Sequence, residues 1–267
     1  MIRAIDVKTN QNVVVKIVRY NEYMKRVGKQ EIKSFELLSK TDPKDQHHCV
    51  RMLDNFEDRG LLCIVMEALS SNMRKVVKKF GQGVGINLKA IQIYGKQLLT
   101  SLLHLKNNGL IHTDFKLDNI LIDDSQQLVK LSDFGSVVER AQARVTNELC
   151  PLWYRPPEIF LGLEYSYSLD IWCFGCTIYE LATGTVLFQG GNLNFYLFFI
   201  LYFFYFLFFY FIFFIFIFYF FYFLFFIFIN KFLLFIFLFL KFILFFYFLN
   251  LFYFLIFNFF FFERNTK

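Results

Sequence analysis

The sequence predicts an α+β fold with two lobes over residues 1–191, followed by a low-complexity tail over residues 192–267. Strand-like segments rich in Val and Ile come first and helical patterns dominate later, which is typical of α+β folds with segregated elements. The composition then changes abruptly after Gly191: the chain has 42 phenylalanines, and 34 of them lie beyond that residue. The two parts therefore have separate interpretations.

The first 67 residues combine β-branched runs with one helical pattern. Three segments are predicted to be strands, the last two joined by a tight turn: residues 12–20, 50–56 and 61–67. Apolar residues recur at helical spacing over residues 27–40, which predicts a helix containing Glu31. These elements form the expected small lobe, residues 1–67.

Helical periodicity dominates residues 68–191, the expected large lobe. Helices are expected over residues 70–80, 88–107 and 169–183. Glycines follow the last two of them, at Gly109 and Gly184, as is common at helix ends. A short β pair is expected between these helices, formed by residues 120–123 and 128–132.

Two motifs in the large lobe carry the chemical information. Residues 112–119 read HTDFKLDN, and an Asp-Phe-Gly triplet begins at Asp133. They resemble the catalytic loop and the metal-binding triplet of eukaryotic protein kinases. Phosphoryl transfer needs an acceptor for the hydroxyl proton, a donor to the phosphate and oxygens that hold Mg²⁺. Asp114 suits the first role, Lys116 the second, and Asn119 with Asp133 the third.

The resemblance extends to the nucleotide site and implies ATP and Mg²⁺ as cofactors. Lys16 resembles the strand lysine that contacts the nucleotide phosphates, with Glu31 as its ion-pair partner. Met66 is at the gatekeeper position, and residues 67–69 (Glu67, Ala68 and Leu69) resemble the hinge whose backbone binds adenine. Taken without the family, Glu31 reads as a solvated helix charge and residues 66–69 as an ordinary strand end.

Other residues match structural positions of the same family. Four correspond to the hydrophobic spine between the lobes: Phe35, Met52, His112 and Phe134. Asp170 corresponds to the aspartate that caps the backbone of the catalytic loop. Within the family, the chain resembles the CMGC group, and within it the splicing-associated pre-mRNA-processing kinases. That branch implies splicing factors as protein substrates and a nuclear location.

The chain also departs from the family pattern. Counted back from Lys16, Met1 falls in the second strand, so the preceding strand and the glycine-rich loop are expected to be missing. The resemblance stops near Gly191, which is expected to leave an uncovered helix face around Ile171 and Ile178 and an unpaired Glu158. Thr113 replaces the usual arginine before the catalytic aspartate. We therefore expect the chain as written to be inactive or unstable.

The tail has two competing interpretations. Only Phe, Leu, Ile, Tyr, Asn and Lys occur over residues 192–262, and codons made of A and T alone can encode all six. The main hypothesis is that residues 192–267 are translated noncoding AT-rich sequence. The alternative is a genuine membrane segment, since the tail exceeds the ~20 apolar residues that a spanning helix needs. It lacks the polar connections that several spans would require.

Charge and cysteine content exclude some classes of function. Residues 1–191 hold 24 Lys and Arg against 21 Asp and Glu, too small an excess to argue for direct nucleic-acid binding. The five cysteines are an odd number, and the start is not a secretory signal. Cys173 and Cys176 have C-x-x-C spacing but no second pair, so buried structural thiols are expected.

The function expected from these observations is an ATP-dependent protein serine/threonine kinase. Two alternatives belong to other classes. The activation segment departs from the family pattern, since Glu148 is at the position of the group's phosphorylatable tyrosine and Pro151 and Leu152 replace the usual Ser/Thr and Arg. A noncatalytic pseudokinase or binding module would fit this altered segment, although the four residues expected to carry the chemistry are all present: Lys16, Asp114, Asn119 and Asp133. A membrane-anchored kinase-like protein would follow only if the tail is genuine.

Overall fold

The structure is a computed structural model that describes residues 1–146, 148–189, 205, 208–217, 241–242 and 244–246. The chain divides into two compact units, Met1–Ile200 and Leu201–Lys267. In the second unit the described residues are helical. Within the described ranges, no helix is both long and apolar enough to cross a membrane. The prediction of a noncoding tail concerns residues that lie mostly outside the described ones.

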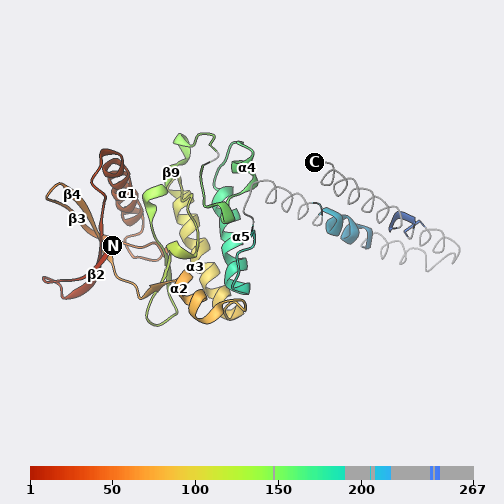
Figure 1. The fold of residues 1–267 in the computed structure, drawn as a ribbon, viewed down its shortest axis with the longest axis horizontal. Helices are drawn as coiled ribbons and strands as arrows, with labels where there is room; N and C mark the ends of the chain where they lie inside the picture. The colour runs from red at the N-terminus through yellow and green to blue at the C-terminus, as the bar shows by residue number, and fades with distance from the viewer. Residues whose placement is uncertain (147, 190–204, 206–207, 218–240, 243, 247–267) are drawn as a thin grey trace, which may run out of the picture. The chain divides into compact units, whose positions relative to one another are not determined.

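The small lobe contains a four-stranded antiparallel sheet in the order β1-β2-β4-β3 (Figure 1). Its strands are β1 (Ile2–Asp6), β2 (Gln11–Ile17), β3 (Met52–Asp58) and β4 (Leu61–Glu67). Arg59 and Gly60 both have positive φ, +48° and +80°, which suits the tight turn between β3 and β4. The strand predicted over residues 12–20 ends three residues early in the structure, at Ile17.

Helix α1 (Glu22–Thr41) packs beside this sheet. The prediction that it begins at residue 27 was wrong, because Asn21 caps the helix: its side chain accepts a hydrogen bond from the Met24 N–H at 2.6 Å. A Cβ atom added at Gly28 would lie 2.9 Å from side-chain atoms of Val18 and Leu62. The glycine therefore lets the helix approach the sheet closely.

The large lobe is mostly helical. Its main helices are α2 (Met73–Val76), α3 (Leu88–Asn107), α4 (Pro157–Phe160) and α5 (Ser168–Thr183). The helix predicted over residues 70–80 was partly wrong. Residues Ser71–Asn72 form strand β5, and the Asn72 side chain then caps α2 by accepting from the Lys75 N–H at 3.0 Å. A π-helical turn, η1 (Val77–Gly81), follows directly.

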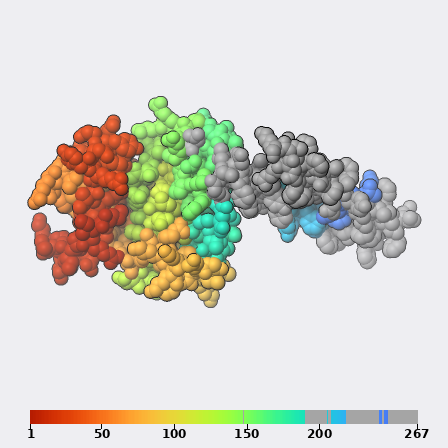
Figure 2. Space-filling view, in the orientation of Figure 1, coloured from red at the N-terminus to blue at the C-terminus, as the bar shows by residue number. Residues whose placement is uncertain are grey.

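Short strands position the catalytic segments. Strands β7 (Ile120–Ile122) and β8 (Val129–Leu131) form the predicted β pair and extend β5 into a three-stranded sheet. Strands β6 (Leu110–Ile111) and β9 (Val138–Glu139) pair with each other. In Figure 2 the red small lobe lies directly against the green part of the large lobe. The buried core runs through both lobes.

Part of the surface of α3 and α5 is apolar and exposed. Leu103 on α3 is 55% exposed and Ile171 on α5 is 52% exposed. Together with Leu99 they line one groove between the two helices. The exposed Ile171 agrees with the helix face expected from the sequence, as far as the described residues extend.

Candidate active site

The first part of the site joins three elements through Lys16. Its Nζ atom on β2 donates to both carboxylate oxygens of Glu31 on α1, at 2.7 and 2.8 Å. The same Nζ lies 2.9 Å from Oδ1 of Asp133. Glu31 is buried, so the interpretation of a solvated helix charge was wrong. The structure therefore brings the three residues together; the family resemblance implied the pair of Lys16 and Glu31, but not the contact of Lys16 with Asp133.

Electrostatics favour the charged forms of Lys16 and Asp133, whereas burial raises the pKa of Glu31 above its ordinary value. Burial by itself would lower the pKa of Lys16, but the carboxylates of Glu31 and Asp133 outweigh it and raise the pKa above its ordinary value. Burial would raise the pKa of Asp133, but the Lys16 ammonium lowers it below its ordinary value. Asp133 therefore carries a negative charge at neutral pH.

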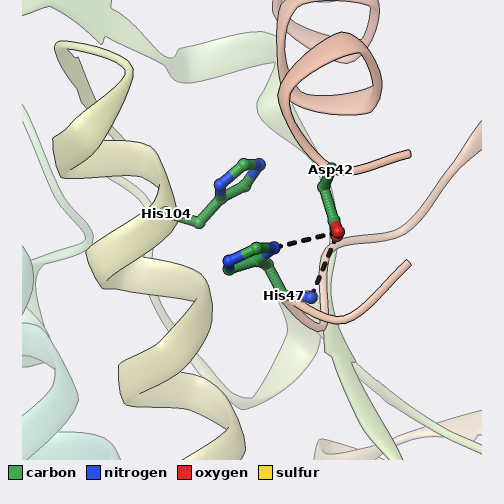
Figure 3. Close-up of side chains that lie close together, drawn as sticks. All are labelled: Asp42, His47 and His104. Atoms are coloured by element: carbon green, nitrogen blue, oxygen red, sulfur yellow. Dashed lines mark hydrogen bonds and ion pairs between the residues drawn. The ribbon is translucent and has the colours of Figure 1, made fainter. Parts of the chain in front are cut away.

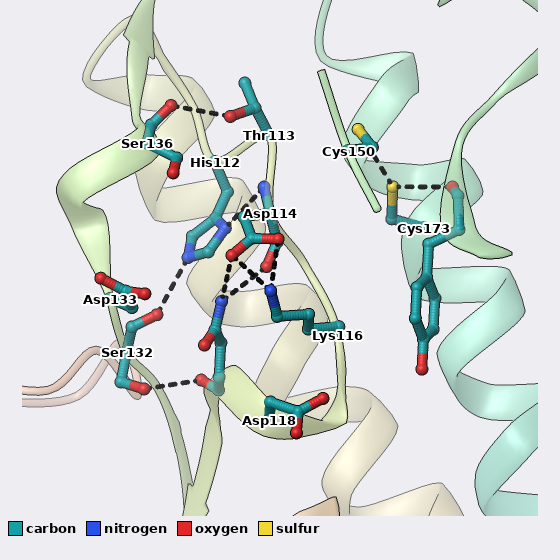
Figure 4. A network of polar contacts seen from close by, with 12 residues as sticks. His112, Thr113, Asp114, Lys116, Asp118, Ser132, Asp133, Ser136, Cys150 and Cys173 are labelled. Carbon is teal, nitrogen blue, oxygen red and sulfur yellow. Dashed lines mark hydrogen bonds and ion pairs between the residues drawn. The ribbon is translucent and has the colours of Figure 1, made fainter. Parts of the chain in front are cut away.

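The second part of the site is the catalytic loop, shown in Figure 4. Lys116 Nζ lies 2.8 Å from each carboxylate oxygen of Asp114. Asn119 Nδ2 donates to the Asp114 carbonyl and to Asp114 Oδ2, both at 2.8 Å. The Asp114 carboxylate is thus held in one orientation, with 17% of its side chain accessible to solvent.

Asp170 on α5 fixes the backbone of this loop. Its Oδ2 accepts from the His112 N–H at 2.7 Å, and its Oδ1 accepts from the Thr113 N–H at 2.9 Å. Thr113 has a φ of +65°, which is rare for a β-branched residue and requires support from its surroundings. Its Oγ1 donates to the Ser136 carbonyl at 2.7 Å, which supplies part of that support.

Aromatic packing links the loop to α1. The ring centroids of Phe35 and Phe134 lie 5.1 Å apart, and those of Phe134 and His112 lie 5.7 Å apart, both in edge contacts. His112 is fully buried, and its Nε2 lies 3.1 Å from the Ser132 carbonyl oxygen. These contacts confirm the packing role expected for His112. Met52 is half-buried and packs against the same core.

The segment after β4 corresponds to the predicted hinge. Met66 is buried in the core, and the backbone of residues 67–69 continues from it. The side chain of Glu67 points to other partners: it accepts from Lys130 Nζ at 2.7 Å and from the Arg51 N–H at 2.8 Å. The Glu67 N–H donates to the Arg51 carbonyl at 3.1 Å, so both the side chain and the N–H of Glu67 are engaged within the protein. Leu69 is half-buried.

The sequence reasoning missed two residues near the hinge. Arg3 on β1 donates to the carbonyls of Leu69 and Ser70, at 2.8 and 2.6 Å. Lys130 is buried, and its ammonium also lies 2.6 Å from Asp45. Their partners lie 63 or more residues away in the chain, so no local pattern indicated them.

Another network missed in the sequence lies beside the catalytic loop. Arg74 on α2 contacts Glu180 on α5, lies 2.5 Å from the Tyr154 hydroxyl and 3.2 Å from Asp118. The Tyr154 hydroxyl also donates to Glu180. Glu180 is buried, and the guanidinium is its charge partner. The network joins α2, the catalytic loop and α5.

The family assignment comes from comparison with known proteins. Residues 1–197 match the family model described as protein kinase domain. The chain belongs to the protein kinase family. The serine/threonine-protein kinase prpf4B of Dictyostelium discoideum is 39% identical over 196 residues, which cover 73% of this chain and 24% of that protein. The serine/threonine-protein kinase prp4 of Schizosaccharomyces pombe is 38% identical over 194 residues, covering 73% and 41%.

The similarity also reaches other kinases. The dual specificity protein kinase YAK1 of Saccharomyces cerevisiae is 38% identical over 187 residues, which cover 69% of this chain and 23% of that protein. This kinase chain spans less than half the length of the curated relatives named above. Kinases of this family generally use ATP and Mg²⁺.

Proposed function

We propose that this chain is the catalytic part of an ATP-dependent protein serine/threonine kinase. One observation carries the proposal. The Asp114 carboxylate accepts hydrogen bonds from both Lys116 and Asn119. Lys16 and Asp133 form a second hydrogen-bonded charged pair. A general acid–base residue, a phosphate-binding cation and hard oxygen donors are the groups that phosphoryl transfer requires.

The residues present fit Mg²⁺ and a nucleotide. Mg²⁺ prefers oxygen ligands, and the Asp133 carboxylate and the Asn119 amide oxygen are of that type. The Asn119 nitrogen is directed to Asp114, so its oxygen faces away from that carboxylate. Lys16 is charged and provides a cation for phosphate oxygens. Asn119 and Asp133 are the proposed metal ligands, and Lys16 the proposed phosphate contact.

Each residue then has a stated task. When bound, ATP would supply the phosphoryl group, and Mg²⁺ held by Asn119 and Asp133 would neutralise its developing charge. The Asp114 carboxylate orients the substrate hydroxyl and accepts its proton. Lys116 donates to the phosphoryl oxygens, exchanging its present contact with Asp114 for that contact. Glu31 holds Lys16 in place, and the backbone of residues 67–69 borders the adenine position.

The resemblance to the splicing-associated branch supports splicing factors as the protein substrates and a nuclear location. The similarity to the two kinases prpf4B and prp4 supports the same branch. The domain limits proposed for the chain are 1–67 for the small lobe, 68–191 for the large lobe and 192–267 for the tail.

Because the chain as written is expected to be inactive, the test is phosphate transfer from labelled ATP to a Ser/Thr-rich protein by the chain with both missing ends of the kinase domain restored, and by three variants of that protein. Asp114→Asn and Asp133→Asn should each reduce transfer at least ~100-fold, the lower range for loss of a general base or a metal ligand. Asp124→Asn is the matched control, because Asp124 is exposed on the β7–β8 hairpin. Equal background transfer by all four proteins would overturn the proposal and favour a pseudokinase.

A further inference from the structure

A second cluster of metal-binding side chains lies away from the active site, at the end of α1 (Figure 3). Asp42 is the first residue after α1, His47 lies in the loop that follows, and His104 lies on α3. One possible ligand atom from each of the three lies within 4.8 Å of the other two. The cluster shares no residue with the proposed kinase site.

The carboxylate of Asp42 is held in place by the loop itself. Its Oδ1 accepts from the Gln46 N–H at 3.0 Å, and its Oδ2 accepts from the His47 N–H at 2.9 Å. Burial would raise the pKa of Asp42, but these backbone donors and the His47 ring outweigh it and lower the pKa to about 2. A charged, oriented carboxylate therefore faces the two imidazoles.

The two histidines are arranged side by side. Their ring centroids lie 4.3 Å apart with an interplanar angle of 18°. The Nδ1 atom of His47 lies 2.9 Å from Asp42 Oδ1, yet it is buried and makes no hydrogen bond of good geometry to any described residue. Burial lowers the pKa of His104, which keeps this imidazole neutral at pH 7. A neutral imidazole is the form that binds a metal.

We propose that Asp42, His47 and His104 form a binding site for a divalent transition-metal ion, with Zn²⁺ as the best fit. Two imidazoles and one carboxylate form a common three-ligand set for zinc, with water in the fourth position. Mg²⁺ prefers oxygen ligands and is not expected to compete. This site is independent of the proposed kinase function.

The two histidine rings must turn before they bind one metal ion. Zinc binds imidazole nitrogen and carboxylate oxygen at ~2.0–2.2 Å, so tetrahedral ligand atoms lie ~3.4 Å apart. The three candidate atoms already lie within 4.8 Å of one another, and rotation of the rings out of their stacked arrangement lets their nitrogens converge on one ion. His104 Nε2 now lies 3.1 Å from the Leu38 carbonyl oxygen. When this nitrogen binds the metal, the carbonyl still accepts from the Thr41 hydroxyl at 3.3 Å.

The position of the cluster gives metal binding a structural effect. Asp42 ends the helix that carries Glu31, and His104 belongs to a helix of the large lobe. A metal ion bound by Asp42 and His104 would join the end of α1 to α3. Its coordination bonds are stronger than the present stacking contact between His47 and His104. Binding should therefore stabilise the folded state, since the unfolded chain lacks the site.

The experiment titrates Co²⁺, a spectroscopic substitute for Zn²⁺, into the metal-free full chain and two matched variants. His47→Asn removes a ligand, whereas His48→Asn changes the next residue, which is outside the cluster. Asparagine tolerates the positive φ of His48, +55°. The measurements are visible d–d absorption of bound Co²⁺ and the Zn²⁺-induced change in Tm, both with excess Mg²⁺ present.

The wild type and His48→Asn should give the same tetrahedral Co²⁺ spectrum and the same rise in Tm with Zn²⁺. His47→Asn should bind Co²⁺ at least ~10-fold more weakly, the minimum expected for loss of a ligand. Absence of the tetrahedral spectrum in the wild type would overturn the proposal. So would an unchanged affinity in His47→Asn, because the metal would then lie elsewhere in the chain.

Discussion

Lys16 and Glu31 form an ion pair in which the ammonium contacts both carboxylate oxygens, at 2.7 and 2.8 Å, and the carboxylate is buried. The pair ties β2 to α1 and sets the position of the lysine. A cation that is fixed in advance loses less entropy when it binds a phosphate.

The first prediction follows from this pair. Glu31→Gln should reduce kcat/KM for ATP by ~10–100-fold, because a charge-assisted hydrogen bond contributes ~1.5–3 kcal/mol. The measurement is initial rate against ATP concentration. Glu36→Gln, exposed on the same helix, is the control. Equal kcat/KM in the two variants would show that Lys16 needs no partner.

The second prediction concerns Asp170, which accepts hydrogen bonds from two backbone N–H groups of the catalytic loop. Asp170→Asn replaces one acceptor oxygen with an amide that itself donates, so one buried N–H loses its partner. The expected cost is ~2 kcal/mol in the free energy of unfolding, measured by urea denaturation. Glu164→Gln, an exposed change just before α5, should leave the urea midpoint unchanged. A midpoint for Asp170→Asn equal to that of the control would contradict the capping role.

The third prediction concerns the contact between Arg74 and the buried Glu180. Arg74→Met leaves Glu180 without its cation and should cost ~3 kcal/mol of stability, as in other broken buried pairs. The neighbouring Lys75→Met, an exposed change on the same short helix, should cost little.

A double variant separates the pair from the packing around it. Arg74→Met combined with Glu180→Gln should be less destabilised than the sum of the two single variants, because the uncompensated charge is gone. Urea denaturation of all four proteins measures the coupling. Strict additivity would mean that the two side chains act independently.

The fourth prediction concerns the thiols. Burial raises the pKa of Cys176 to about 12, and the hydrogen bond with Cys150, together with burial, raises the pKa of Cys173. Since the thiolate is the reactive form, both should label slowly at pH 8, and labelling should quicken as the pH rises. All five cysteines should react rapidly in denaturant without reductant. Recovery of only three thiols would instead indicate a disulfide.

Local patterns predicted much of the fold. The helix over residues 88–107 and the strand over residues 61–67 have the predicted limits, because each has a strong apolar period. The start of α1 was wrong because Asn21 and the polar first turn carry no apolar repeat. The helix predicted over residues 70–80 was wrong at its start, because Asn72 both ends the two-residue strand β5 and caps helix α2.

The residues of the candidate site also fall into those that a local sequence pattern predicted and those that it did not. Asp114, Lys116 and Asn119 lie within six residues, so their spacing reveals them. The pairing of Lys16 with Glu31 was expected only from the family resemblance. Arg74 and Lys130 have partners 106 and 63 residues away, which are brought close by the packing of the lobes. No local pattern contains such information.

The capping of the catalytic loop by Asp170 has a consequence for synthesis. The ribosome adds residues from the N-terminus, and Asp170 follows His112 by 58 positions. Until those residues emerge, the His112 and Thr113 N–H groups lack these acceptors, and the positive φ of Thr113 lacks the part of its support that Asp170 supplies. The catalytic loop can therefore reach its final shape only after α5 has been made, so a nascent chain paused before Asp170 should have the small lobe folded and the catalytic loop open.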